Sequence, residues 1–198
     1  MSNIYVYYLN NKIYINLTNQ CSNNCDFCIR RDREGMANQK LWLTELPSAN
    51  DVIAQLPENL DDFDDEVVFC GFGEPTYNLD ALEDVALFLH CKGKTTRINT
   101  NGQGSLINKT DISSLIADTC DIVNVSLNAS NAKAYDAVCH SIYKEKAFDE
   151  LLDFAKKVKS KGAKVVLSVV DCITQKEIEL CRKVADKIGV PLRVRAKE

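Results

Sequence analysis

The sequence predicts an α/β fold, a partial (βα)6 barrel of parallel strands that is open on one side and carries an N-terminal β-hairpin. Residues 1–198 are expected to form one domain. Strand-like and helix-like runs alternate six times along the chain, which is typical of parallel strands joined by right-handed crossover helices. Six such units are too few to close an eight-stranded barrel. Polar and apolar side chains alternate within several strands, whereas strands covered on both faces read as nearly continuous hydrophobic runs. One face should therefore pack against helices, and the other should line a polar cavity.

The chain is expected to begin with the hairpin and the first barrel strand, residues 1–18. Two runs rich in β-branched and aromatic side chains lie here, and Asn10-Asn11 between them fits a tight turn. Residues 19–43 show little periodicity and are expected to form a long loop.

The remaining elements continue the alternation. Ser48 is an N-cap candidate for a short helix that Pro57 ends. Further helices are expected over residues 79–89, 111–116, 151–158 and 174–188, and further strands over residues 66–71, 95–100, 121–127, 164–170 and 192–195.

The composition excludes several classes of protein. A formal net charge of −4 argues against sequence-independent binding of nucleic acid, which requires a basic surface. The N-terminus lacks the pattern of a signal peptide, and no apolar run is long enough to span a membrane. A cytoplasmic protein without a membrane partner is therefore expected, and its nine cysteines should be free thiols together with one metal site.

The metal site is predicted from Cys21, Cys25 and Cys28, which have C-x3-C-x2-C spacing. Thiolates are soft ligands that select iron-sulfur clusters, zinc or Cu(I). Four cysteines would close such a site, whereas three leave one iron of a cubane open to a small molecule. The alternatives are three incidental thiols or a Cys3His zinc site, whose histidine would be the distant His90 or His140.

At these cysteines, with Phe27 just before the last, the chain resembles the radical S-adenosylmethionine (SAM) superfamily. The resemblance implies that residues 19–43 are a cluster-binding loop, in which the three cysteines hold a [4Fe-4S] cluster. It also implies that the fourth iron of the cluster binds the amino and carboxylate groups of SAM. The segments FCGFGEP, RINTNG, VSLNA and PLRVR make the chain similar to TatD-associated radical SAM proteins, and TNG is similar to glycyl-radical activating enzymes.

Further candidate residues lie at the carboxyl ends of the expected strands, where parallel α/β folds bind ligands. Gly71-Phe72-Gly73-Glu74 resembles the GGEP motif of the superfamily, although Phe72 replaces its first glycine. The resemblance implies that this backbone and Glu74 bind the SAM amino group. It also implies contacts with the SAM ribose for Asn99 and Asn101, and with the ribose or the carboxylate of SAM for Ser126 and Asn128.

The expected function is that of a radical SAM enzyme, which cleaves SAM reductively and uses the 5′-deoxyadenosyl radical to abstract hydrogen from its substrate. Such an enzyme needs a low-potential electron donor such as flavodoxin or ferredoxin, and a lid that excludes water. Residues 31–43 and the hairpin are the available lids. The rival readings are an iron-sulfur electron-transfer or redox-sensing protein without SAM chemistry and a zinc-binding interaction module.

The substrate is expected to be a small molecule or peptide that carries an anionic group. Arg97, Arg193 and Arg195 fall on the polar faces of their strands, where a cation is costly unless paired. These arginines could pair with carboxylates of the chain instead. Within residues 30–33, further arginines either form a solvated face or contact the substrate. Cys139 and Cys172 could also meet near the site.

Overall fold

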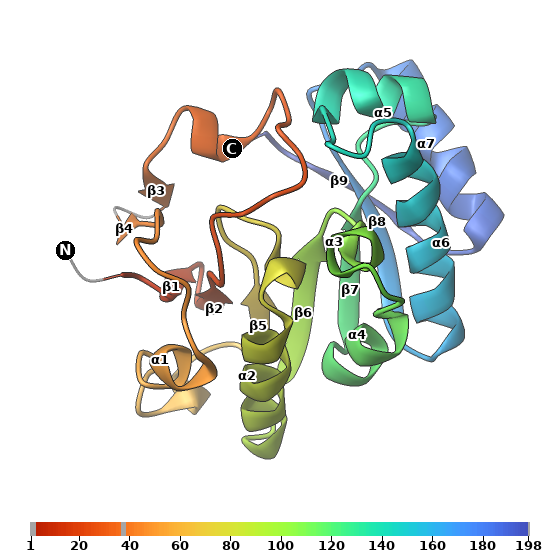
Figure 1. Ribbon diagram of the computed structural model, residues 1–198. Helices are drawn as coiled ribbons and strands as arrows, with labels where there is room; N and C mark the ends of the chain where they lie inside the picture. The colour runs from red at the N-terminus through yellow and green to blue at the C-terminus, as the bar shows by residue number, and fades with distance from the viewer. Residues whose placement is uncertain (1–2, 37–38, 198) are drawn as a thin grey trace.

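The computed structural model describes residues 3–36 and 39–197, and its main element is a seven-stranded sheet in the order β1-β2-β5-β6-β7-β8-β9 (Figure 1). The hairpin strands β1 (Val6–Leu9) and β2 (Lys12–Ile15) are antiparallel. All later neighbours are parallel, and they are β5 (Glu66–Phe69), β6 (Thr95–Thr100), β7 (Ile122–Ser126), β8 (Lys164–Val170) and β9 (Leu192–Arg195). Within the described residues, the edge strands β1 and β9 do not pair with each other. The predicted α/β architecture, with its hairpin and open parallel sheet, is confirmed.

Helices connect the parallel strands and cover one face of the sheet (Figure 1). They are α1 (Ala49–Ile53), α2 (Leu79–Cys91), α3 (Gly104–Asn108), α4 (Ser113–Thr119), α5 (Ala132–Cys139), α6 (Lys146–Ser160) and α7 (Gln175–Ile188). Single 3-10 turns are η1 (Ile29–Arg31), η2 (Leu60–Asp62) and η3 (Pro75–Tyr77). Over residues 3–36 and 39–197, none of the helices has the length and hydropathy needed to span a membrane.

Two parts of the chain contain more structure than the periodicity predicts. Helices α3 and α5 were not expected; α5 begins at an N-cap, Asn131, whose side chain accepts a hydrogen bond from Ala134 N. The loop over residues 19–43 contains η1 and a small sheet in which β3 (Gly35–Met36) pairs with β4 (Gln39–Lys40). Residues 37 and 38 of this loop lie outside the described residues. Elements of two or three residues are too short to show a period.

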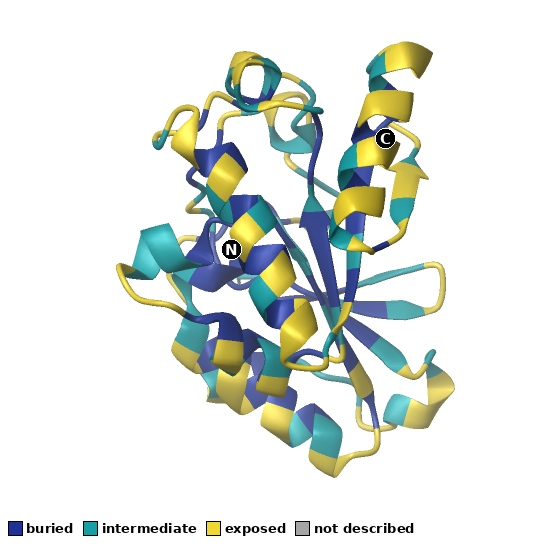
Figure 2. Cartoon of the chain, turned by 90° about the vertical axis from the view of Figure 1, so that its right-hand side faces the viewer, coloured by how far each residue is buried: buried dark blue, intermediate teal, exposed yellow. Residues whose placement is uncertain are grey.

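The strands place apolar side chains on the helix side and polar ones on the other, as the alternation predicts. Buried residues are concentrated in the strands and on the inner sides of the helices (Figure 2). Each apolar side chain buried in this way stabilises the fold by about 1.5 to 3 kcal/mol. The completely buried strand residues include Ile13, Ile15, Val67, Phe69, Ile98, Val123, Val125, Leu167 and Val169.

The opposite face of the sheet carries a polar stripe across four strands. In register, Asn99 of β6 lies opposite Asn124 of β7, and Ser126 lies opposite Ser168 of β8, which is itself opposite Arg193 of β9. Because the sheet curves into a partial barrel, these side chains share one interior. The fold therefore presents amides, hydroxyls and a guanidinium to a common space.

Candidate functional site

The three predicted cysteine ligands line one cavity of about 480 Å³ at the carboxyl ends of the strands. Cys21, Cys25 and Cys28 all come from the segment that follows β2. Cys28 is the N-cap of η1, and its backbone N–H donates to Cys25 O at 3.2 Å. The loop therefore brings thiols from three neighbouring positions to the wall of a single cavity.

Two of these thiols, those of Cys21 and Cys25, have a raised pKa, which favours their protonated form in the absence of a cation. Burial raises the pKa of Cys21 to about 12, and the negative charge of Glu74 adds to this shift. The pKa of Cys25 is also raised, first by a side-chain hydrogen bond with Cys139 and then by burial. A metal ion or cluster that binds here must replace these protons.

The arrangement of the thiols does not suit a single metal ion. Within residues 3–36 and 39–197, no three His, Cys, Asp or Glu side chains converge in a way that could hold one ion. The thiolates of a cubane each bind a different iron, so they surround a volume rather than a point. His90 and His140 bind Asp121 (3.1 Å) and Asp26 (2.9 Å) and do not line the cavity, which argues against the Cys3His alternative.

Arg30 fixes the position of the segment from Cys21 to Cys28, which we call the cysteine loop. Its guanidinium donates to three backbone carbonyls, those of Asn19 (3.0 Å), Phe72 (3.1 Å) and Asn23 (3.1 Å). These bonds join the segment after Cys28 to the loop that follows β5. Arg30 is therefore a structural clamp, rather than a free cation for a substrate.

Gly71 and Gly73 allow this second loop to approach the strand and loop beside it. A Cβ at Gly71 would lie 2.0 Å from Asn16 Oδ1, and a Cβ at Gly73 would lie 2.2 Å from Thr18 O. Both positions therefore require glycine. Phe72 between them packs against Tyr7 and Leu41 in a small apolar cluster. All three residues of the predicted GFG segment line the cavity.

Glu74 is a buried carboxylate at the wall of the cavity, only 3% exposed. Its Oε1 accepts hydrogen bonds from Thr100 Oγ1 (2.6 Å) and Thr76 Oγ1 (2.8 Å), whereas Oε2 accepts one from Asn101 N (2.6 Å). Burial raises the pKa of Glu74, although these hydrogen bonds oppose the rise. Oε2 retains room for a further donor, and a cation placed there would stabilise the charged form.

The predicted amide and hydroxyl residues at the strand ends, Asn99, Asn101, Ser126 and Asn128, line the same cavity. They are not equally available to a ligand. Asn101 Nδ2 donates to Ser22 Oγ at 2.9 Å, and its Oδ1 accepts from Gln103 N, so this side chain holds the cysteine loop. Asn128 has a positive φ of 55°, and its buried Oδ1 has no hydrogen-bond partner within the part of the chain that the structure describes.

A buried polar network behind the cysteine loop was not predicted. Tyr135 Oη accepts hydrogen bonds from Asn23 Nδ2 and Gln103 Nε2, both at 2.9 Å. Ser141 Oγ donates to Gln103 Oε1 at 2.8 Å. Nothing in the sequence relates these residues, because they lie up to 118 positions apart along the chain, from Asn23 to Ser141. The network connects the loop to α5 and to the turn after β6.

The three predicted substrate arginines do not share one environment. Arg193 and Arg195 line the cavity, together with Lys197. Arg97 is not among the lining residues, and its Nη1 lies 3.5 Å from Glu66 Oε1 near the amino ends of the strands. Arg97 therefore shows the alternative arrangement, a pair with a carboxylate of the chain.

Cys139 and Cys172 also lie in different surroundings. Cys139 is buried against Cys25, whereas Cys172 is exposed. The structure therefore brings Cys139, and not Cys172, to the cysteine loop.

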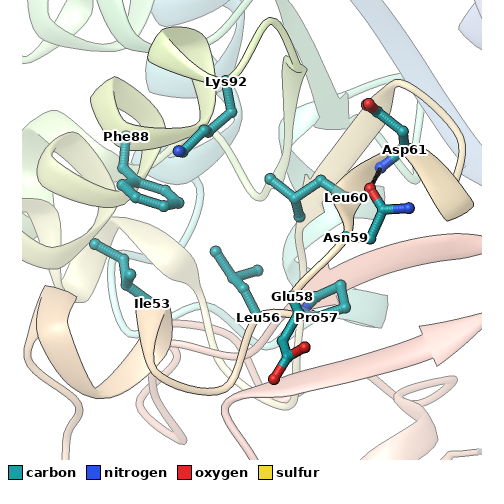
Figure 3. A pocket seen from close by; sticks show the side chains of 9 residues that line it. All are labelled: Ile53, Leu56, Pro57, Glu58, Asn59, Leu60, Asp61, Phe88 and Lys92. Carbon is teal, nitrogen blue, oxygen red and sulfur yellow. Dashed lines mark hydrogen bonds between the residues drawn. The ribbon is translucent and has the colours of Figure 1, made fainter.

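A second cavity, of about 370 Å³, lies on the outside of the barrel near the amino end of β5. Side chains of α1, α2 and the segment before β5 surround it, including Ile53, Leu56 and Phe88 (Figure 3). It contains no thiol and none of the predicted site residues. The cavity at the carboxyl ends is therefore the candidate functional site.

The fold and this cavity define a class of protein, an open α/β barrel with a cluster of thiols at the carboxyl ends of its strands. Residues 15–183 match the radical SAM superfamily, so the chain belongs to that superfamily. The match does not test the finer likeness to TatD-associated proteins or glycyl-radical activating enzymes, which stays a prediction. Among curated proteins, none matches the sequence.

Solved structures of radical SAM proteins share the fold. SuiB of Streptococcus suis bound to its precursor peptide SuiA superposes with a TM-score of 0.71 at 20% identity, over 93% of this chain and 39% of SuiB. A radical SAM methyltransferase from Sphaerobacter thermophilus gives 0.65 at 16% identity, over 96% of this chain and 68% of that one. TYW1 with a lysine-pyruvate adduct bound gives a TM-score of 0.65 at 14% identity, over 95% of this chain and 65% of that chain. This chain thus spans well under half of the length of SuiB.

The superfamily binds a [4Fe-4S] cluster and SAM, and the residues present fit both. Three thiols line one cavity, and each of them could bind a separate iron of a cubane. Glu74 Oε2 has spare capacity for an ammonium group, and Asn128 Oδ1 is buried without a partner among the described residues. Thiols, carboxylate and amide all face the same space.

Proposed function

We propose that this chain is a radical SAM enzyme in which Cys21, Cys25 and Cys28 ligate three irons of a [4Fe-4S] cluster and leave the fourth for SAM. The observation that carries the proposal is that the three thiols and the buried Glu74 line one cavity. When bound and reduced, the cluster would supply the electron for reductive cleavage of SAM to a 5′-deoxyadenosyl radical, which would abstract a hydrogen atom from the substrate. The chain's own residues bind, orient and shield these reactants.

Glu74 and the strand-end amides would bind SAM. Glu74 Oε2 would accept a hydrogen bond from the ammonium group of SAM, and because the carboxylate is buried this charge-assisted bond would be strong. Asn128 Oδ1 accepts from a further donor of SAM, and Ser126 and Asn99 offer a hydroxyl and an amide beside it. The backbone of Gly71 and Gly73 stays close enough to contact the ligand because neither residue carries a side chain.

The proposed substrate is a peptide or small molecule with a carboxylate or phosphate. Arg195 supports this proposal, because it is half-buried and its Nε is buried without a partner within the described ranges. Arg193 and Lys197 lie on the same side of the cavity. The SuiB structure contains a bound precursor peptide, so the fold can accommodate a substrate of that size.

Water has to be kept from the radical, and an electron has to reach the cluster. Tyr7 of the hairpin and Met36 and Leu41 of the predicted lid line the cavity, so we expect both segments to close over the substrate. A low-potential donor such as flavodoxin or ferredoxin would supply the electron in the cytoplasm.

The test is anaerobic purification followed by iron and sulfide analysis, and then addition of dithionite and SAM. We expect about four irons per chain and release of 5′-deoxyadenosine. An intact, reducible cluster that never yields 5′-deoxyadenosine would favour an iron-sulfur electron-transfer or redox-sensing protein instead. Zinc in place of iron would favour an interaction module.

A further inference from the structure

Cys139 is a buried thiol that lies against the cysteine loop and has no role in the function proposed above. It is the last residue of α5 and is completely buried. Its carbonyl accepts a hydrogen bond from Asn24 N at 2.9 Å, and the carbonyl of Val138 accepts one from Asp26 N at 3.0 Å. These two bonds lie on either side of Cys25, so the end of α5 fixes the backbone around one cluster ligand.

The side chains continue this contact. The Cys139 thiol lies against the Cys25 thiol, so that a sulfur–sulfur hydrogen bond can join them. On its other side, Asn128 Nδ2 donates to Cys139 Sγ at 3.7 Å. Asn128 itself is 3% exposed and lines the cavity, and its Oδ1 has no partner within residues 3–36 and 39–197. A buried chain of three polar groups therefore runs from the cavity wall to Cys25.

We propose that Cys139 is a positioning residue that donates an S–H hydrogen bond to the Cys25 thiolate and couples the cluster to the ligand bound at Asn128. The direction of the bond follows from the chemistry, since a thiolate bound to iron has no proton to donate. Cys139 must then be the donor, and its own sulfur remains free to accept from Asn128. This inference rests on the proposed function, because it requires Cys25 to ligate a cluster.

This chain of hydrogen bonds from Asn128 through Cys139 to Cys25, which we call the relay, has two physical consequences. A hydrogen bond to a cluster sulfur stabilises the more negative, reduced state, and so raises the reduction potential. A ligand that donates to Asn128 Oδ1 polarises the amide and strengthens its N–H donor, because bonds in a chain reinforce one another. Ligand binding at Asn128 should therefore favour cluster reduction, and reduction should tighten binding by the same factor.

The experiment measures the midpoint potential of the purified, cluster-loaded protein by anaerobic titration, followed by electron paramagnetic resonance with and without SAM. Cys139→Ala removes the donor, Cys139→Ser restores one, and Cys120→Ala is the matched control, because Cys120 is also a buried thiol but precedes β7 at the amino end of the sheet. In Cys139→Ala we expect the ratio of reduced to oxidised cluster at a fixed potential to fall about 3- to 10-fold, or roughly 30 to 60 mV. We also expect a smaller shift on addition of SAM. Cys139→Ser should recover most of the wild-type potential.

The outcomes separate the two proposals. A wild-type protein that takes up no cluster would overturn both the proposed function and the relay. A loaded protein in which Cys139→Ala and Cys120→Ala have the same potential would overturn the relay alone. The relay would also fail if Cys139→Ser behaved like Cys139→Ala, since a purely steric role of the sulfur would give that result.

Discussion

The two ends of the barrel interior differ in how their charged groups are satisfied. At the amino ends, Arg97 lies 3.5 Å from Glu66, whose carboxylate also binds Lys12 at 2.8 Å. At the carboxyl ends, Arg195 has no carboxylate within ion-pair distance in the part of the chain that the structure describes, although both arginines leave a buried Nε without a partner there. A desolvated cation is costly unless it is paired. The charges at the amino end are thus paired within the chain, whereas Arg195 at the carboxyl end offers a cation that an anionic ligand would pair with.

The largest difference between the two ends is expected at the cysteines. Alanine at Cys21, Cys25 or Cys28 should abolish the cluster, because two thiolates leave two irons of a cubane without protein ligands. Cys91→Ala is the control, since Cys91 is an exposed thiol at the end of α2 that lies outside the cavity. Iron content and the brown absorbance measure the effect. A triple variant that kept its full absorbance would exclude these ligands.

A smaller effect is expected for Glu74→Gln, which replaces a charge-assisted acceptor at the cavity by a neutral amide. The cluster should form normally, but SAM affinity should fall by roughly 10- to 150-fold, because the lost bond is worth about 1.5 to 3 kcal/mol. Calorimetry of the loaded protein measures this change. Glu66→Gln is the matched control at the amino end, where Glu66 binds Lys12 and Arg97. Equal affinities for SAM in all three proteins would place Glu74 outside the binding site.

The smallest effects are expected from substitution of Arg97 and Arg195, which can be compared directly. Arg97→Met removes an ion pair, and should lower the free energy of unfolding by about 1 kcal/mol. Arg195→Met should change it by less than about 0.5 kcal/mol, yet should leave SAM cleavage uncoupled from productive turnover. Urea unfolding and product analysis measure the two properties.

Arg182→Met, at an exposed position of α7, controls for the loss of one positive charge. If Arg195→Met destabilised the fold as much as Arg97→Met, Arg195 would be structural. Normal turnover of an identified anionic substrate would equally remove its proposed role.

Local patterns in the sequence predicted much of this molecule. The cysteine motif and the GFGEP segment are contiguous, so their positions at strand ends followed from the alternation of strands and helices. The alternation of side chains along the strand predicted correctly that Arg97 and Asn99 share one face of β6. It could not predict how far along the barrel axis each residue lies, because the alternation repeats every two residues, whereas that position depends on the register with the neighbouring strands.

The unpredicted contacts are those between distant segments. Cys139 meets Cys25 only because α5 ends beside the loop, and Asn101 binds Ser22 only because the turn after β6 reaches it. Helix α5 carries only a short apolar pattern, so its N-cap Asn131 was the one local signal for it. Tertiary packing, rather than periodicity, decides such pairs.

The clamp formed by Arg30 has a consequence for the order of assembly. One of its three acceptors, the carbonyl of Phe72, lies 42 positions further along the chain, in the loop that follows β5. The cysteine loop can therefore reach its final shape only after β5 has joined β2 in the sheet. Iron should accordingly be delivered to a chain that has already folded, and a nascent chain that exposes only the three cysteines should be a poor acceptor for it.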